Sequence, residues 1–464
     1  MISINPATNE TIRTYQEMTP AMVSEAVGSA HAAWLAWRGA AFPERASMMK
    51  RAAAILRNRK EELARLMASE MGKPLKQGIA EAEKCAWVCD YYADAAESQL
   101  TDEVVRTDAL KSYVAFQPLG VILAIMPWNF PLWQVYRFAA PALMAGNVGI
   151  LKHASNVTGC ALIIEEIFEQ AGFPRNTFRT LIMGSAQVEA VIRNPLVRAV
   201  TLTGSTPAGR AVASQAGSVL KKTVLELGGS DPYIVLADAD LEQAVKTCVD
   251  SRLINSGQSC IAAKRFIVED SVIAEFTSRF VAAMRSRTMG DPFAEGTDVG
   301  PMARADLRDE LHRQVLQSVQ SGATLLLGGE IPDCVGAYYP PTVLGDVVPG
   351  MPAYDDELFG PVASIVRAHD EDDAVRIAND SVFGLGSAVF TKDVARGERV
   401  ALRLEAGAAF VNASVASDPR LPFGGVKESG YGRELGSFGI REFLNIKTVY
   451  LKPASASATA RRSE

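Results

Sequence analysis

The sequence lacks the features that mark membrane, exported and nucleic-acid-binding proteins. None of its apolar runs is long enough to span a bilayer, and its N-terminal segment lacks the basic and apolar stretches of a signal peptide. The 464 residues carry a formal net charge of −6, so no basic surface favours nucleic acid or an anionic membrane. We therefore expect a cytoplasmic protein.

Cysteine and histidine are scarce. The chain has six cysteines and four histidines, and no two cysteines have the C-x-x-C spacing. A disulfide framework is not expected in a long chain without an export signal. A protein-bound metal is not expected either, because no His, Cys and carboxylate residues cluster in the sequence. For most single cysteines the simplest interpretation is an inert, buried thiol, and we apply it to Cys85, Cys89, Cys160, Cys248 and Cys334.

Strand-like and helix-like segments alternate along most of the chain. Apolar residues at helical spacing predict one helix over residues 43–70, and β-branched apolar runs predict strands at Lys111–Pro118 and Val197–Thr203. The alternation continues to about residue 411, which indicates two α/β domains built on parallel sheets. A ligand site is expected between the domains, at the carboxyl ends of strands.

One predicted strand is followed by a glycine turn and a helix start, at residues 200–209. Gly204 and Gly209 flank this turn, and the Ser205 hydroxyl can add to the free amides of the helix start, which suit a phosphate. Glycine turns of this kind are also common in proteins without a phosphate ligand. The segment alone therefore leaves both interpretations open.

Two further segments place a reactive side chain beside glycine. Glu226 precedes Gly228 at the end of a predicted strand, where a part-buried carboxylate can act as a base. Cys260 follows a polar, glycine-containing loop and can act as a nucleophile if its pKa is lowered. A solvated turn glutamate and a buried inert cysteine are the simpler interpretations, and each is commoner for an isolated motif.

A rigid turn and two loops complete the set of candidate motifs. Two prolines bracket Trp128 and Asn129 after a predicted strand, and this frame can hold a side-chain amide as an oxyanion donor, although a structural turn is the alternative. Lys152 ends another strand and is either a cofactor contact or a surface lysine. Glycine- and proline-rich loops around Glu357 and at residues 422–430 are typical of ligand-facing loops.

Together and in this order, these segments resemble the aldehyde dehydrogenase superfamily over nearly the whole chain. The matching motifs are PWNFP, a strand-end lysine, TGS-x-x-x-G, ELGG, GQ-x-C, E-x-FGP and PFGG-x-K-x-SG-x-GRE, with EMGKP near the start. Within the superfamily the sequence is most similar to the bacterial succinate-semialdehyde dehydrogenases, especially their shorter, NAD-type branch. The resemblance implies an α/β fold with a Rossmann-like cofactor domain, a catalytic domain and a small β extension.

The same resemblance implies domain boundaries and an assembly. Residues 1–107 and 119–228 are expected to form the dinucleotide-binding domain, and residues 229–430 the catalytic domain. Strands within residues 108–118 and 440–455 are expected to join the subunits of a homodimer or homotetramer. Residues 456–464 are expected to form a flexible tail.

The resemblance also implies a reaction, the oxidation of an aldehyde to a carboxylic acid. Cys260 attacks the aldehyde carbon, while the side chain of Asn129 and the backbone N–H of Cys260 stabilise the oxyanion. Hydride transfer to the nicotinamide leaves a thioester on the cysteine. Glu226 then activates the water that hydrolyses this thioester.

The implied cofactor is NAD or NADP, bound without a G-x-G-x-x-G motif. Lys152 is expected on the adenosine ribose, Ser205 on the pyrophosphate and Glu357 on the nicotinamide ribose. Many NAD-preferring relatives have a glutamate where this chain has Ser155. Because serine does not repel a 2′-phosphate, we expect both cofactors to be used. The other expected cofactor contacts are Trp128, Gly204, Gly209, Gly228 and Phe359.

The closest resemblance favours succinate semialdehyde, an aldehyde with a distal carboxylate. Arg137 is expected to pair with that carboxylate, because such pairs are strong and directional. A helix-surface arginine or an intersubunit ion pair is the alternative. Trp133, Ser417 and Phe423 are expected to line the substrate site with it.

The sequence differs from many relatives at two positions near the nucleophile. Some relatives have a second arginine where this chain has Ile254, and some have a second cysteine where it has Ala262. No disulfide switch is therefore expected. Recognition of the carboxylate is either weaker than in those relatives or assisted by Ser417 or Arg420.

Several functions stay open from the sequence alone. Another semialdehyde or a general aliphatic or aromatic aldehyde is an alternative substrate, and for a neutral aldehyde Arg137 would have no carboxylate partner. A CoA-acylating dehydrogenase is disfavoured because such relatives usually lack the glutamate at position 226. A structural protein on the same fold need not keep Cys260, Asn129 and Glu226 together.

Overall fold

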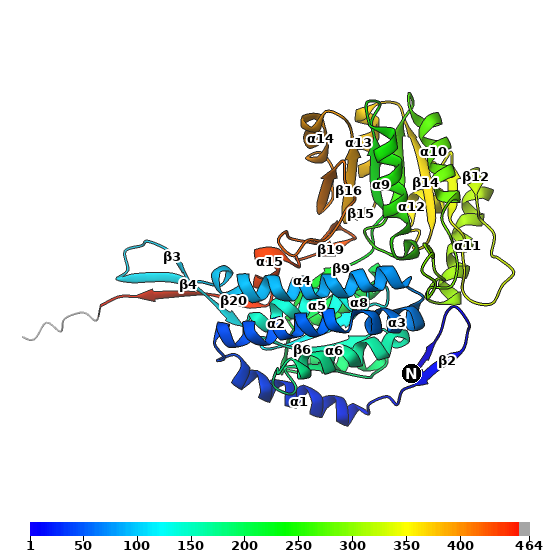
Figure 1. Cartoon of the computed structure of the whole chain (residues 1–464). Coiled ribbons are helices and arrows are strands. Elements are labelled where there is room, and N and C mark those ends of the chain that lie inside the picture. The colour runs from blue at the N-terminus through cyan, green and yellow to red at the C-terminus, as the bar shows by residue number, and fades with distance from the viewer. Residues whose placement is uncertain (454–464) are drawn as a thin grey trace, which may run out of the picture.

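The computed structural model describes residues 1–453, which form two α/β units and a projecting β sheet (Figure 1). The first unit contains α1 to α8 and lies below the second unit, which contains α9 to α14, in the view of Figure 1. Within residues 1–453 no helix combines the length and the apolar character needed to cross a bilayer. The α/β class predicted from the sequence is confirmed.

A six-stranded sheet forms the centre of the first unit, in the order β19-β9-β8-β5-β6-β7. Neighbouring strands are parallel except β19 and β9. Its central strands β5 and β8 are mostly apolar and, apart from the exposed Arg198, largely buried, as expected of a parallel sheet covered by helices on both faces. The strands are β5 (Val121–Met126), β6 (Val148–His153), β7 (Phe178–Thr180), β8 (Val197–Thr203), β9 (Lys222–Glu226) and β19 (Gly430–Tyr431).

Helices surround this sheet, and every residue of α5 is buried. The helices of the first unit are α1 (Pro20–Trp37), α2 (Phe42–Asn58), α3 (Lys60–Met71), α4 (Leu75–Gln99), α5 (Trp133–Met144), α6 (Thr158–Gln170), α7 (Val188–Arg193), α8 (Thr206–Gly217) and α15 (Gly436–Arg441), with short 3-10 turns η1 (Ser155–Val157) and η2 (Ser185–Gln187).

The prediction of one helix over residues 43–70 is wrong. The chain forms α2 and α3 instead, and Arg59 between them leaves the helical conformation with φ −104° and ψ 10°. The guanidinium of Arg59 donates to Glu62 on α3 and to Glu166 on α6, both at 2.8 Å. The sequence has no glycine or proline at this point to mark the break, and only the contacts made by Arg59 in the fold indicate it.

A seven-stranded sheet forms the second unit, in the order β12-β13-β14-β11-β10-β16-β17, with β12 antiparallel to β13 and the other neighbours parallel. Along β10, Ile234 packs in one buried cluster while Tyr233 and Val235 pack in another, so each face of the sheet has its own core. The strands are β10 (Asp231–Val235), β11 (Ala263–Glu269), β12 (Thr324–Leu327), β13 (Thr342–Gly345), β14 (Val362–Ala368), β16 (Gly386–Phe390) and β17 (Ala408–Val411). The helices are α9 (Leu241–Leu253), η3 (Ile254–Gly257), α10 (Ile273–Arg285), α11 (Ala305–Gln320), α12 (Pro352–Asp355), α13 (Glu371–Asn379) and α14 (Val394–Ala401).

The chain passes between the two units twice. Strand β9 ends at Glu226 in the first sheet and β10 begins at Asp231 in the second, so the predicted boundary near residue 228 lies between the sheets. The chain returns before residue 430, because Phe423, Leu435 and Phe443 belong to the buried core of the first unit. Two small antiparallel sheets complete the fold: β1 (Ile2–Ile4) with β2 (Thr11–Thr14), and β15 (Phe383–Gly384) with β18 (Val426–Lys427).

A three-stranded antiparallel sheet projects away from both units (Figure 1). It consists of β3 (Glu103–Val104), β4 (Lys111–Pro118) and β20 (Leu444–Leu451). Apolar side chains are exposed on it, among them Val104 and Ile446, and Leu110 directly before β4 is exposed as well. The strand predicted at Lys111–Pro118 is confirmed, whereas its role in joining subunits stays a prediction. The predicted tail, residues 456–464, lies outside the described residues.

Candidate active site

Cys260 follows a loop with an unusual backbone. Asn255, Ser256 and Gly257 have consecutive positive φ angles of 52°, 55° and 76°, a conformation that is unfavourable for side chains other than glycine. A Cβ at Gly257 would lie 2.2 Å from the carbonyl oxygen of Gly360. Glycine is therefore required where this loop passes the E-x-FGP segment, which explains the glycine of the GQ-x-C motif.

The side-chain amide of Asn129 lies against the same loop. Its Nδ2 donates to the carbonyl of Gln258 at 3.1 Å, and its Oδ1 accepts from Nε2 of Gln134 at 3.1 Å. The backbone carbonyl of Asn129 accepts from Nδ2 of Asn255 at 2.6 Å. Because the oxygen of the Asn129 side chain is held by a donor, its N–H groups are directed toward the loop that carries Cys260.

Glu226 is buried at the carboxyl end of β9, with 2% of its surface exposed. Within residues 1–453, neither of its carboxylate oxygens has a hydrogen-bond partner. Burial raises the pKa of Glu226 well above its usual value, and the positive charge of Arg137 opposes part of that rise. A Cβ at Gly424 would lie 2.7 Å from Oε1 of Glu226, so a glycine of the PFGG loop leaves room for this carboxylate.

The thiol of Cys260 is less acidic than the sequence interpretation required. Burial raises its pKa to about 12, while Arg137 and Lys264 act to lower it. The expected lowered pKa is therefore not found, because removal from water outweighs the nearby positive charges.

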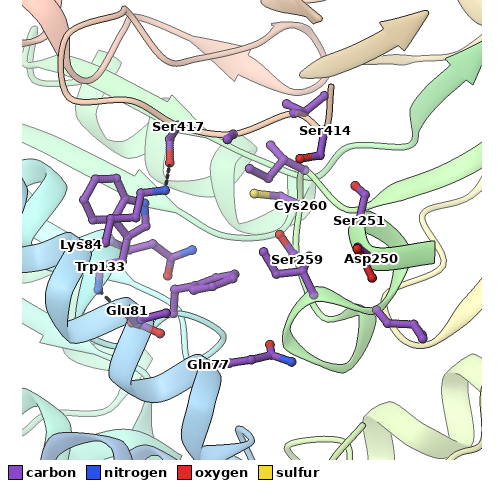
Figure 2. Close-up of a pocket in the computed structure, with 18 of the residues that line it drawn as sticks. Gln77, Glu81, Lys84, Trp133, Asp250, Ser251, Ser259, Cys260, Ser414 and Ser417 are labelled. Atoms are coloured by element: carbon purple, nitrogen blue, oxygen red, sulfur yellow. Dashed lines mark hydrogen bonds between the residues drawn. The ribbon is translucent and has the colours of Figure 1, made fainter. Parts of the chain in front are cut away.

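The Cys260 thiol opens into a cavity of about 460 Å³ where the two units meet. In Figure 2 the sulfur is directed toward Lys84, Trp133 and Ser417, while Ser251 lies on its opposite side. The cavity is lined by segments far apart in the sequence, including α4, α5, the end of α9 and residues 414–417. All four residues predicted for the substrate site line this cavity: Trp133, Arg137, Ser417 and Phe423.

Arg137 is already balanced by a carboxylate. It is 3% exposed and forms a buried ion pair with Glu434 of the GRE segment. Its Nη2 donates to Oγ1 of Thr203 at 3.3 Å, and its guanidinium lies 4.6 Å from the ring centroid of Phe423. The alternative of a helix-surface arginine is thus wrong, whereas the pairing of Arg137 with a substrate carboxylate stays a prediction.

Lys84, on α4, lines the same cavity and was not predicted. Its Nζ donates to Oγ of Ser417 at 2.8 Å (Figure 2) and lies 4.4 Å from the ring centroid of Trp133. Burial, and to a smaller extent the charge of Arg137, lowers the pKa of Lys84 to about 8. Lys84 and Ser417 are 333 positions apart, so no local sequence pattern connects them.

The two positions at which the sequence differs from many relatives both lie close to Cys260 in the sequence. Ile254 lines the cavity, and Ala262 is buried beside the nucleophile loop. Arg420 is exposed and pairs with Asp418 at 2.6 Å, and it is not part of the cavity lining. The prediction that Arg420 assists carboxylate recognition is therefore not supported, whereas Ser417 is in place for it.

The predicted phosphate segment forms the turn between β8 and α8. Ser205 is the N-cap of α8, and within residues 1–453 its hydroxyl makes no capping hydrogen bond. In that part of the chain the hydroxyl and the backbone N–H groups at the helix start are therefore open to a ligand, except at Pro207, which has no N–H. A Cβ at Gly209 would lie 2.6 Å from Leu227, whereas one at Gly204 would meet nothing closer than 3.6 Å. Gly209 is thus required for packing, and Gly204 leaves open space at the turn.

The other predicted cofactor residues follow the neighbouring parallel strands β5 and β6. Trp128 lies after β5, with its ring 5.7 Å from that of Phe359. Lys152 is the last residue but one of β6, and burial lowers its pKa. Ser155 is exposed at the start of η1. Because β5, β6 and β8 are adjacent and parallel, their carboxyl ends form one edge, where α/β sheets bind ligands.

Glu357 connects the cofactor edge with the nucleophile loop. Its Oε1 accepts from the backbone N–H of Gly229 at 3.0 Å and lies 3.3 Å from Nζ of Lys264. A Cβ at Gly228 would lie 2.4 Å from Oε2 of Glu357. Lys264, which the sequence interpretation did not single out, also donates to the carbonyl of Cys260 at 2.8 Å.

The remaining cysteines differ in exposure. Cys85, Cys89, Cys160 and Cys248 are buried, and burial raises the pKa of each thiol. Cys334 is exposed, so the prediction that it is buried is wrong. It lies in a loop between β12 and β13, where the short sequence context does not distinguish a surface thiol from a core thiol.

Comparison with known proteins agrees with this geometry. Residues 1–449 match the model of the aldehyde dehydrogenase family. The chain is 51% identical over 449 residues to a probable succinate-semialdehyde dehydrogenase [NADP(+)] of Synechocystis sp., covering 97% of this chain and 99% of that protein. It is 51% identical over 453 residues to a succinate-semialdehyde dehydrogenase [NADP(+)] of Mycobacterium avium, covering 97% and 96%.

A solved structure is similar throughout. The succinic semialdehyde dehydrogenase of Streptococcus pyogenes, in complex with NADP+, has a TM-score of 0.95 and 37% identity, covering 97% of this chain and all of that one (100%). The motif resemblance, the family match over almost the full length and this shared fold lead to one conclusion. The chain belongs to the aldehyde dehydrogenase family.

Proposed function

We propose that this enzyme oxidises succinate semialdehyde to succinate, using NADP or NAD. The observation that carries the proposal is the net positive charge of the side chains that line the cavity at the Cys260 thiol. Four Lys or Arg side chains and three Asp or Glu side chains line it: Lys76, Lys84, Arg137, Arg287, Glu81, Asp250 and Asp298. The relatives at 51% identity, which carry this substrate in their names, support the same substrate.

Attack by sulfur begins the reaction. The Cys260 thiolate forms a bond to the aldehyde carbon, and the carbonyl oxygen takes the negative charge of the thiohemiacetal. Nδ2 of Asn129 and the backbone N–H of Cys260 would stabilise that oxyanion. Arg137 and Lys264 favour the thiolate over the thiol, against the effect of burial.

Hydrolysis of the thioester requires a base. A carboxylate whose pKa is raised by burial accepts a proton readily once it is ionised, and Glu226 is such a group. Glu226 would take a proton from water, the hydroxide would add to the thioester carbon, and the Cys260 thiolate would leave. Because neither oxygen of Glu226 accepts a hydrogen bond within residues 1–453, both are available to that water.

The residues at the cofactor edge fit a dinucleotide. The free Ser205 hydroxyl and the unbonded amides at the start of α8 suit a pyrophosphate. Lys152 would hold the adenosine ribose, Glu357 the nicotinamide ribose, and Trp128 and Phe359 the nicotinamide side. When bound, the nicotinamide supplies a hydride acceptor.

Use of both cofactors is supported by one position. Ser155 is exposed beside the strand end that carries Lys152 and has no charge to repel a 2′-phosphate. The relatives named for NADP and the NADP+ complex of the Streptococcus pyogenes protein agree with this. A NAD-dependent aldehyde dehydrogenase of Sinorhizobium meliloti also shares the fold, with a TM-score of 0.95 and 33% identity.

The test is a comparison of substrates. We expect kcat/KM for succinate semialdehyde to exceed that for butanal, which has the same number of carbons and no carboxylate, with either NADP or NAD and without CoA. Formation of the reduced cofactor is followed by absorbance. Equal values for the two aldehydes would refute the proposed substrate, and a requirement for CoA would refute hydrolysis.

A second candidate is oxidation of neutral aldehydes. It is favoured by the ion pair between Arg137 and Glu434, which removes the cation that the sequence assigned to the substrate. The same comparison decides between the two candidates, since a neutral-aldehyde dehydrogenase would prefer butanal.

Assembly and compartment complete the proposal. A homodimer or homotetramer formed through β4 and β20 is supported by the exposed apolar side chains of the projecting sheet. A cytoplasmic location is supported by the free, exposed thiol of Cys334, because oxidising compartments favour disulfides.

A further inference from the structure

Most charged side chains that line the cavity are already matched by an opposite charge. Lys76 pairs with Asp298 at 2.7 Å, and Arg287 pairs with Asp250 at 2.6 Å. These pairs have no charge left for a substrate. The same is true of the buried pairs Arg137 with Glu434 and Glu81 with Lys73.

Lys84 is the exception. Within residues 1–453, no carboxylate oxygen lies within the 4.0 Å of an ion pair from its Nζ. Its one hydrogen bond in this part of the chain is to the neutral hydroxyl of Ser417, and its ammonium lies over the face of Trp133. Figure 2 shows these three side chains on one side of the Cys260 sulfur.

A partly buried ammonium without a carboxylate partner is less stable in its charged form than one in water, and a bound anion would remove this penalty. Partial loss of water destabilises the ammonium, which is why burial lowers the pKa of Lys84 to about 8. A carboxylate placed beside Nζ would restore the charged form and gain a charge-assisted hydrogen bond. The Ser417 hydroxyl, which now accepts from Nζ, would be able to donate to the other carboxylate oxygen.

We infer that Lys84, together with Ser417, binds the distal carboxylate of the substrate while the aldehyde lies at Cys260. This inference rests on the proposed function and names the residue that gives it specificity. The cation missing at Ile254 is then supplied from α4. The apolar surfaces of Trp133 and Phe423 enclose the short carbon chain between the two ends.

The alternative is that Lys84 only supports the packing of Trp133 through a cation–π contact. A structural role would affect every aldehyde to the same extent, because the damaged wall is common to all of them. A role in carboxylate binding would affect only acidic substrates, and mainly through KM. The two roles are therefore separable by kinetics.

The experiment compares Lys84→Met, Lys84→Arg and the control Lys76→Met with the unchanged enzyme, on succinate semialdehyde and on butanal. Lys76→Met removes a cation from the same helix and the same cavity, but one that is paired with Asp298. For Lys84→Met we expect kcat/KM for succinate semialdehyde to fall about 10- to 100-fold through KM, with butanal changed by less than about threefold. Lys84→Arg should retain most of the activity, and Lys76→Met should lose less than about threefold.

A binding measurement gives a second readout. Succinate should inhibit the unchanged enzyme competitively, and its inhibition constant should rise in Lys84→Met by the same factor as KM, whereas that of butanoate should not. Butanal turnover shows that the variant is folded. Equal losses for both aldehydes, or no loss for either, would overturn the assignment of Lys84 while leaving the proposed function intact. If the unchanged enzyme shows no preference for succinate semialdehyde, the proposed function itself fails.

Discussion

The surroundings of Glu226 and of Lys84 show opposite solutions to the burial of an ionisable group. Glu226 is an acid whose pKa burial raises, and it is enclosed at the end of β9. Lys84 is a base whose pKa burial lowers, and it lines the cavity onto which the Cys260 thiol opens. The surroundings of Glu226 favour binding of a proton, as a general base requires, and the surroundings of Lys84 favour binding of an anion. Burial thus has opposite consequences in the two regions, which suit the roles proposed for them: proton transfer at Glu226 and carboxylate binding at Lys84.

Arg137 connects these two regions. Its charge lowers the pKa of both Glu226 and Lys84, and it is held in place by the ion pair with Glu434. In this position it acts on the electrostatics of both regions. The comparison predicts which changes affect all aldehydes and which affect only acidic ones.

The largest effect is expected from Glu226→Gln, which removes the base. We expect kcat to fall about 10²- to 10⁴-fold for every aldehyde, because the thioester is no longer hydrolysed efficiently. The first turnover should still release one equivalent of reduced cofactor, since Glu226 acts after hydride transfer. Rapid mixing measures this burst, and a burst lost together with kcat would show that Glu226 acts before the thioester forms.

A smaller effect is expected from Arg137→Met. Removal of one partner of a buried ion pair leaves Glu434 unpaired, at a cost of about 3–5 kcal/mol in the free energy of unfolding. We expect kcat/KM to fall for succinate semialdehyde and for butanal alike, as measured by steady-state kinetics and denaturant unfolding. A loss confined to succinate semialdehyde would instead restore Arg137 as the carboxylate clamp predicted from the sequence.

The smallest effect is a difference in pH dependence. Lys84 is charged below its pKa of about 8, so binding of a carboxylate is fully supported below that pH and is lost as pH rises above it. The ratio of kcat/KM for succinate semialdehyde to that for butanal should fall about tenfold per pH unit above pH 8, since effects on Cys260 and Glu226 cancel in the ratio. The charged and titratable groups that influence Lys84 are Arg137 on α5, Glu81 and Cys85 on α4, and Asp418 beside Ser417. A ratio that does not change with pH would contradict the assignment of Lys84.

Local patterns predicted the parts of the fold that are determined locally. The strands at Lys111–Pro118 and Val197–Thr203 are confirmed because β-branched residues and burial determine them. The interruption at Arg59 was missed because contacts with α6 accompany it and no helix breaker marks it. Sequence patterns therefore predicted these helices and strands but not the long-range contacts between them.

The candidate site shows the same division. The motifs that carry Cys260, Asn129 and Glu226 each lie in one short segment, so a sequence comparison finds them. The cavity wall is assembled from α4, α5 and residues 414–417, and only the fold brings Lys84 to Ser417. The pairing of Arg137 with Glu434 was missed for the same reason. The two residues are far apart in the sequence, and only the topology of the fold brings them together.

The most direct test of the account is to identify the sulfur that becomes acylated. Glu226→Gln, mixed with succinate semialdehyde and NADP and then quenched, should carry one succinyl group on the peptide that contains Cys260, as measured by mass spectrometry. The further change Cys260→Ser should abolish both this modification and the release of reduced cofactor. Turnover of aldehydes by a Cys260→Ser enzyme at an undiminished rate would contradict the account.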